Sequence, residues 1–185
     1  MVKKWFLWLL FGMTTALANP GQLVEVQVQI DGEVVRVDLN MLVPATQSQV
    51  WSVLTDYEHM AGFVSNLKQS KVLNVSGNTL KIFQSGQASY GALNFSFEST
   101  REVQLTPYEK IHSRLLSGNM RRFEGRTELY QEGSQTRVVY HSESIPGVWI
   151  PPVIGKIFIE HESREQFQEL RDEIIRRLPT PPAQP

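Results

Sequence analysis

Apolar and polar residues alternate along much of this chain. The alternation begins at 24–30, and the pair Asp31-Gly32 that follows is typical of a tight hairpin turn. A second strand is expected at 35–43. From Ser70 to Ser144 the alternation continues in runs separated by Gly, Pro, Asn and Ser, which predicts about six further antiparallel strands joined in a meander.

Two segments have the spacing of helices instead. Thr46 and Gln49 form a capping-box pattern, which predicts a short helix after the first two strands. Its buried residues would be Val50, Trp51, Val53, Leu54 and Tyr57. A short broken helix or loop is expected at 59–66. A long helix is expected at 153–178, where Pro179 ends it. This order of elements, with no internal repeat, predicts one α+β domain.

The long helix carries a stripe that is apolar at both ends and charged in the middle, where Glu160 and Arg164 stand. Either these two residues form an ion pair with each other, or they face a solvated cavity and hold the polar end of a ligand. Ile154 and Phe158 make the first turns apolar all round. Either the loop with Trp149 covers these turns, or they form an exposed apolar surface at the entrance to the cavity. Such a surface would permit transient contact with a membrane.

The ends of the chain differ from the domain. Lys3 and Lys4, the apolar run 5–13 and the small residues of Ala16-Leu17-Ala18 predict a secretory signal at 1–18, cleaved after Ala18. The alternative is a permanent anchor, but the run is shorter than the roughly 20 residues that a spanning helix needs. We therefore expect a periplasmic or secreted domain at 19–178. The Pro-rich segment 179–185 is expected to be a disordered tail.

Composition excludes several classes of function. The chain has no Cys, so disulfides, thiol chemistry and thiolate metal sites are excluded. Its net charge is −1 and would fall to −3 without Lys3 and Lys4, which gives no general attraction to nucleic acid or anionic lipid. The four His residues lack metal-site spacing, and Glu165 stands where a His-Glu-x-x-His motif starting at His161 needs its second His. We expect neither metal nor cofactor.

Several short motifs along the chain match one known family. They are Trp51-x-x-Leu54-x-Asp56-Tyr57, Phe63-Val64, Ser70-Lys71-Val72-Leu73, Arg122-Phe123-Glu124-Gly125, Ile145-Pro146 and Pro151-Pro152. With these motifs the chain, from about Val34 to Leu178, resembles the polyketide cyclase/dehydrase and coenzyme-Q-binding-protein branch of the START-like (SRPBCC) superfamily. The resemblance implies a helix-grip fold, in which a curved antiparallel sheet wraps the C-terminal helix around a deep apolar cavity.

The resemblance and the patterns together imply an exported binding or carrier protein for a hydrophobic or amphipathic molecule such as a lipid, quinone or isoprenoid. The expected ligand-binding residues are Tyr57, Phe63, Phe83, Phe95, Phe97, Trp149, Glu160, Arg164 and Phe167. One alternative is a cyclase or dehydratase that uses groups such as Arg164 or Glu160 as proton donor or acceptor. The other is a structural or protein-interaction module, which a helix packed on the sheet without a cavity would favour. No nucleophile, phosphate-loop or dinucleotide motif is present, so we assign no catalytic residue.

Overall fold

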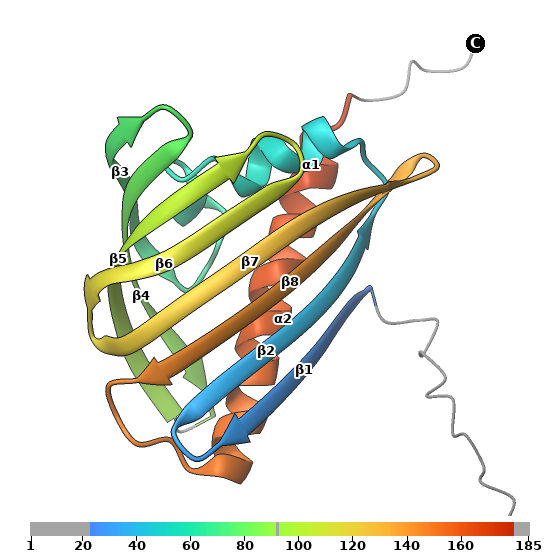
Figure 1. Ribbon diagram of the computed structural model, residues 1–185. Helices are drawn as coiled ribbons and strands as arrows, with labels where there is room; N and C mark the ends of the chain where they lie inside the picture. The colour runs from blue at the N-terminus through green and yellow to red at the C-terminus, as the bar shows by residue number, and fades with distance from the viewer. Residues whose placement is uncertain (1–22, 92, 180–185) are drawn as a thin grey trace, which may run out of the picture.

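The computed structural model describes residues 23–91 and 93–179. Eight antiparallel strands form one sheet in the order β1-β2-β8-β7-β6-β5-β4-β3 (Figure 1). The strands are β1 (Val24–Asp31), β2 (Val34–Val43), β3 (Leu67–Ser76), β4 (Thr79–Tyr90), β5 (Leu93–Thr106), β6 (Lys110–Gly118), β7 (Met120–Glu132) and β8 (Gln135–Pro146). The helices are α1 (Gln47–Leu54), the short 3-10 helix η1 (Met60–Gly62) and α2 (Pro152–Arg176).

Local sequence explains the first turns of this fold. β1 and β2 form the predicted hairpin, and Gly32 adopts a φ of 59° in its turn, a conformation that most other residues disfavour. The predicted capping box is confirmed, since the Thr46 side chain accepts from the Gln49 backbone N–H and the Gln49 side chain accepts in return. These signals fix the start of α1 directly after the hairpin.

The connection from β2 to β3 carries the chain from one side of the sheet to the other through α1 and η1. β2 pairs with β8 rather than with β3, so the first hairpin joins the far side of the meander. The sheet curves around α2, and α1 lies beside the C-terminal end of that helix (Figure 1). The expected α+β helix-grip fold is confirmed. α2 begins one residue earlier and ends two residues earlier than the sequence predicts.

One apolar core extends through the space between the sheet and the helices. Val37, Met41, Val138 and Val50 are buried there together with Ile174 of α2. The facing positions on β4, β5 and β6 include the buried polar residues Gln84, Ser99 and Ser113. The core also includes Ile82 and Val103 of these strands, so the buried polar residues are what distinguishes this part of the interior and marks it as a candidate site.

The predicted signal at 1–18 and nearly all of the predicted tail, 180–185, lie outside the described residues. Within residues 23–91 and 93–179, no helix combines the length and the apolar content that crossing a bilayer requires.

Candidate functional site

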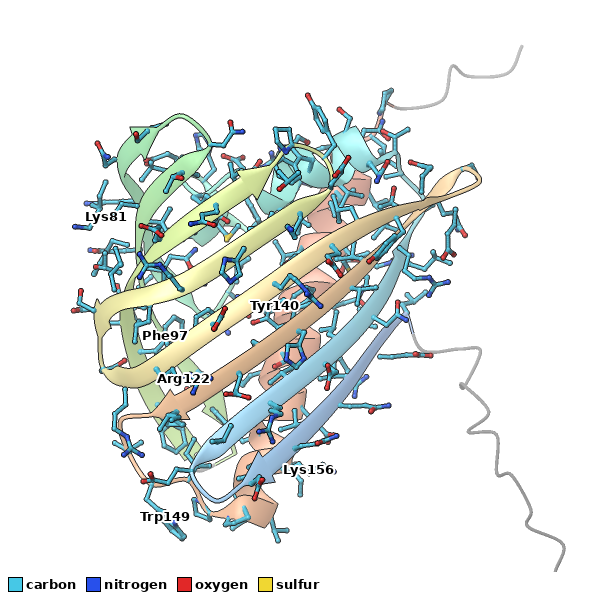
Figure 2. All side chains as sticks on the ribbon, viewed as in Figure 1. Lys81, Phe97, Arg122, Tyr140, Trp149 and Lys156 are labelled. Carbon is cyan, nitrogen blue, oxygen red and sulfur yellow. The ribbon has the colours of Figure 1, made fainter. Side chains whose placement is uncertain are left out.

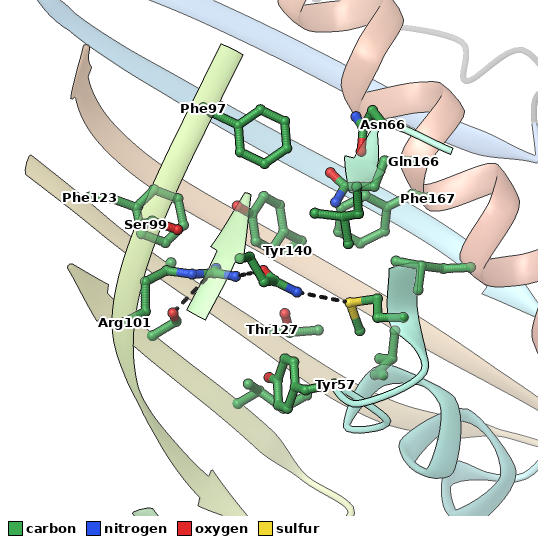
Figure 3. Close-up of a pocket in the computed structure, with 18 of the residues that line it drawn as sticks. Tyr57, Asn66, Phe97, Ser99, Arg101, Phe123, Thr127, Tyr140, Gln166 and Phe167 are labelled. Atoms are coloured by element: carbon green, nitrogen blue, oxygen red, sulfur yellow. Dashed lines mark hydrogen bonds between the residues drawn. The ribbon is translucent and has the colours of Figure 1, made fainter. Parts of the chain in front are cut away.

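A cavity of about 250 Å³ lies between the sheet, α2 and η1 (Figure 3). Its apolar wall comes from the sheet, from α1 and η1, and from α2, and includes Leu54, Met60, Phe97, Ile111, Phe167 and Leu170. Polar side chains gather on the sheet side, around Arg101 of β5. An apolar chamber with a few convergent polar groups is the usual form of a small-molecule site.

Arg101 reaches this cavity because side chains alternate along β5. Phe97, Ser99 and Arg101 stand on the same face of the strand, two residues apart. A register shift between Thr100 and Arg101 interrupts the pairing of β5 with β6, and such bulges commonly re-aim a side chain beside a binding site.

The guanidinium of Arg101 is held by neutral groups. Its Nη2 donates to Gln84 Oε1, and its Nη1 donates to Ser113 Oγ at 3.5 Å. Gln84 is fixed in turn, since its Nε2 donates to Ser70 Oγ at 3.0 Å. The Phe123 ring centre lies 5.4 Å from the guanidinium carbon. Arg101 Nε is buried and has no hydrogen-bond partner, so the site keeps one donor unused.

The cavity carries a single charged side chain. Arg101 is cationic, and no Asp or Glu is among the residues that line the chamber in the described part of the chain. Burial lowers the pKa of Arg101, partly offset by the nearby phenols of Tyr57 and Tyr140. Arginine keeps its proton in proteins, so the group remains cationic. An uncompensated cation in a mostly apolar space is costly and calls for a polar or anionic partner.

Two phenols complete the polar wall, from the buried Tyr57 and the partly buried Tyr140. Burial raises the pKa of Tyr57 to about 12, against the opposing effect of the Arg101 charge. Burial also raises the pKa of Tyr140, whose ring packs 5.1 Å from that of Phe167. Both phenols are therefore neutral near pH 7 and can donate or accept hydrogen bonds. Neither is suited to removing a proton from a ligand.

Of the sequence-predicted ligand residues, Tyr57, Phe97 and Phe167 line the cavity. Phe95 does not line it, but its ring lies 5.1 Å from the ring of Phe158. This pair joins β5 to the beginning of α2. The expected contact of these aromatic residues with a ligand stays a prediction.

Three other predicted aromatic residues stand away from the cavity. Phe63 packs under Arg177, with 5.2 Å between the ring centre and the guanidinium carbon. Phe83 alternates with the buried Ile82 and Gln84, which places it on the other face of β4. Trp149 is 77% exposed at the end of the molecule (Figure 2). None of the three is among the lining residues.

Glu160 and Arg164 follow neither of the two interpretations made for them. No ion pair joins them in the described structure, and neither lines the cavity. Arg164 Nη1 donates instead to the backbone carbonyl of Val24 at 2.7 Å. Val24 begins β1, so this arginine ties α2 to the edge strand. The charged part of the α2 stripe therefore contacts the edge strand β1 through Arg164.

Apart from Tyr57, the side chains of the polar wall are not among the ligand residues predicted from the sequence. Arg101, Gln84 and Ser113 lie on three neighbouring strands and converge only when β4, β5 and β6 pair. The alternation that sets Phe95 and Phe97 on one face of β5 continues to Arg101, so this residue has a signal in the sequence. The convergence of the other two requires the strand register, which no local pattern specifies.

An open acidic groove adjoins the cavity at Asn66 and Gln166. His161, Glu162 and Glu165 bring potential ligand atoms within 4.8 Å of one another there. His161 pairs with Glu165 at 3.3 Å, and Glu162 accepts from Asn66 Nδ2 at 3.3 Å. Burial raises the pKa of Glu162, an effect that this hydrogen bond opposes. All three side chains therefore already have partners within the protein. The expected absence of a metal stays a prediction.

Residues 43–171 match the family described as polyketide cyclase / dehydrase and lipid transport. The chain belongs to this family. The matched range begins at the end of β2 and includes most of α2, so it contains every residue of the cavity. No curated protein sequence matches the chain significantly.

Solved structures with this fold include both binding proteins and enzymes of the START-like superfamily. An aromatase/cyclase from a Streptomyces species aligns with a TM-score of 0.67 and 15% identity, over 80% of this chain and 97% of that one. A STAR-related lipid transfer protein from Xanthomonas axonopodis gives 0.67 and 15%, over 85% and 97%. A START superfamily protein from Mycobacterium smegmatis gives 0.66 and 14%, over 76% and 97%. At such identities the likeness establishes the fold alone.

Proposed function

We propose that this chain is an exported binding or carrier protein for one small amphipathic molecule, held in the cavity with its polar end at Arg101. The observation that carries the proposal is the single, partly buried cation Arg101, without a carboxylate partner, in an otherwise uncharged chamber. The apolar part of the ligand would lie against Phe97 and Phe167. The polar part would accept hydrogen bonds from Arg101 and meet the Tyr57 and Tyr140 phenols.

The chemistry of the polar wall favours an anionic end such as a carboxylate. Arg101 has a buried Nε–H without a partner, and a carboxylate oxygen is a strong acceptor for it. The partners that already hold the guanidinium, Gln84 and Ser113, are neutral and leave its charge uncompensated. An ionised ligand would therefore supply what the folded protein lacks.

The size of the cavity limits the ligand. Its 250 Å³ is slightly below the roughly 300–1,000 Å³ of pockets that enclose drug-sized molecules. A molecule with one acyl chain of moderate length, or a compact ring system, suits this space better than a two-chain phospholipid. A quinone or isoprenoid with a long tail would need the cavity to open further. A carboxylic acid with one chain of moderate length fits both the volume and the charge of the cavity.

The test combines identification of the natural ligand with measured binding of a defined probe. Protein purified from its native cell compartment should release one amphipathic acid, detected by mass spectrometry after solvent extraction. Decanoate should then bind the emptied protein with one site in calorimetry. A processed N-terminus beginning after Ala18, found by intact-mass analysis of the same sample, would support export.

A matched pair of variants on β5 provides the control. Ser99 is buried and lines the cavity, so Ser99→Leu should fill the chamber and abolish decanoate binding. Ser96 is exposed on the opposite face of the strand, so Ser96→Leu should bind as the parent does. Equal binding by both variants, or no binding of any amphiphile by the parent, would refute the proposal.

The second candidate is a cyclase or dehydratase acting on a similar ligand. The grouping of Arg101 with two neutral phenols favours it, because such groups can stabilise a developing enolate oxygen. The cavity has no His, Asp or Glu to serve as a base among the described residues. Conversion of a bound ligand, lost in Arg101→Met protein that still binds it, would establish the enzyme. A structural or protein-interaction module would be favoured by a helix packed on the sheet without a cavity. The cavity between helix and sheet removes that argument for it.

A further inference from the structure

Five large apolar residues are exposed together at one end of the molecule. They come from the β8–α2 loop and the first turns of α2, and comprise Val148, Trp149, Val153, Ile154 and Ile157. We call this group the apolar tip. Trp149 is 77% exposed, Val153 74% and Ile154 54%. Figure 2 shows Trp149 pointing away from the sheet at the lower end of the molecule. Such clustering differs from the singly scattered apolar residues of an ordinary surface.

The exposure of the tip is built into the fold. Gly155 is buried where α2 begins, and a Cβ there would lie 2.0 Å from Ile150 and 3.7 Å from Ile30. This close approach seats the first turn of α2 on the sheet through Ile150. On the inner side Phe158 packs on Phe95. With its inward positions occupied by these contacts, the first turn presents Val153, Ile154 and Ile157 outward.

The charges around the tip are suited to a negatively charged surface. Lys156 is exposed among the apolar residues and has no acidic partner in residues 23–91 and 93–179. The two acids of the adjacent β1–β2 turn each have an arginine nearby, since Asp31 lies 3.9 Å from Arg36 and Glu33 lies 2.5 Å from Arg121. Glu160 stands one turn farther from the tip than Lys156. The end of the molecule is therefore apolar and carries one lysine without an acidic partner among the described residues, although the chain as a whole is slightly acidic.

We infer that the apolar tip docks the protein on a phospholipid bilayer that contains anionic lipid. A protruding group of side chains without a groove fits a surface that side chains can penetrate. Trp149 supplies the ring that favours the boundary between headgroups and acyl chains, and Lys156 reaches the phosphates beside it. Val153, Ile154 and Ile157 enter the acyl region. This docking goes beyond ligand binding and does not depend on it.

The experiment is flotation of the purified protein, in the processed form that the cell produces, with vesicles of phosphatidylethanolamine and phosphatidylglycerol. The parent should float with the vesicles, and the Trp149→Ser, Ile154→Ser double variant should lose about tenfold or more of its apparent affinity. The matched control is the Leu73→Ser, Val75→Ser double variant, which removes two exposed apolar residues from β3 at the opposite end. The control should float as the parent does.

A second measurement tests the geometry directly. In the processed form, which lacks Trp5 and Trp8, Trp51→Phe leaves Trp149 as the remaining tryptophan, and bromine-labelled lipids should quench its emission. Lys156→Glu should weaken flotation more at low salt than at high salt. Equal flotation of the tip variant and the parent would overturn the inference. So would a tip variant that leaves flotation intact but abolishes a dimer in sedimentation, because the tip would then bind a second copy.

Discussion

The guanidinium carbon of Arg101 lies 5.4 Å from the centre of the Phe123 ring, beside a cavity that no acid of the described structure lines. Arg101→Met would remove the buried charge and keep most of the side-chain volume. We expect the free energy of unfolding of the ligand-free protein to rise by about 1 kcal/mol, because an unpaired buried charge is costly. Urea unfolding monitored by circular dichroism measures this change.

The same variant should bind decanoate about ten- to a hundredfold more weakly, the range expected for loss of a charge-assisted hydrogen bond. Decanol, which has no charge, should bind the variant and the parent about equally. Calorimetry with both probes separates the charge effect from a change in cavity shape. Equal loss for acid and alcohol would show that Arg101 shapes the cavity without recognising an anion.

Gly86 marks a close approach between β4 and the loop that precedes β3. A Cβ at this position would lie 2.0 Å from the Asn66 carbonyl oxygen and 2.5 Å from the ring of Phe97. Gly86→Ala should therefore lower the free energy of unfolding by about 1–3 kcal/mol, as overpacking does, and displace two lining residues. Ligand binding should weaken in parallel.

The matched control is Gly62→Ala in η1, where a Cβ would meet nothing within 4 Å. Its free energy of unfolding should stay within about 0.5 kcal/mol of the parent. Thermal unfolding of both variants makes the comparison. If Gly86→Ala and Gly62→Ala lowered the free energy of unfolding equally, the loss of glycine itself would explain the destabilisation, and the close contact at Gly86 would not.

The sequence predicts the fold well because its signals are local and agree with one another. The Thr46 capping box, the turn at Gly32 and the alternation of the strands each act within a few residues, and each is present in the structure. The order of the elements then favours one antiparallel sheet that packs against one long helix. The family resemblance specifies that arrangement.

The site is predicted less well because its members meet only through pairing at a distance. The helix stripe drew attention to Glu160 and Arg164, but a period of 3.6 does not say which neighbour faces a given position. The carbonyl of Val24, 140 residues away in sequence, turned out to be the partner of Arg164. The alternation along β5 is enough to predict that Arg101 faces the cavity. To place Gln84 beside it, the register between β4 and β5 must also be known.

Tyr57 should make the protein sensitive to alkali. Its folded pKa of about 12 exceeds the usual value of 10, so the unfolded chain loses this proton more readily. The associated stability is fully present below pH 10 and is lost as pH rises from 10 to 12. Two pKa units correspond to about 2–3 kcal/mol. Tyr57→Phe should lose correspondingly less stability over this range in urea titrations at stepped pH.

The control for this measurement is Tyr108→Phe, since Tyr108 is exposed beside Trp51 and away from the cavity. Its alkaline profile should follow that of the parent. If Tyr57→Phe also follows the parent between pH 10 and 12, then another buried group, such as the Tyr140 phenol, accounts for the loss.

Glu173 should have the opposite pH dependence. Its carboxylate, in a residue only 6% exposed, accepts from Arg176 Nε and Nη2 at 2.7 and 2.6 Å and from Arg177 Nε at 2.7 Å. The hydrogen bonds from Arg176 lower the pKa of Glu173 most; burial opposes them, and those from Arg177 add to the effect. The folded pKa lies below the usual 4.5, so the stability is present above pH 4.5 and is lost as pH falls through the lower folded value.

Glu173→Gln should therefore reduce the free energy of unfolding at pH 7 by about 1 kcal/mol, because the Arg176 side chain is 71% exposed and water screens its charge. The variant should also lose less stability than the parent between pH 4.5 and 3, measured by urea unfolding at each pH. Asp172→Asn is the matched control, since that exposed neighbour accepts only from Gln168 among the described residues. An acid profile of Glu173→Gln parallel to that of the parent would show that other carboxylates, such as Asp56 beside Arg177, hold the end of α2 against acid.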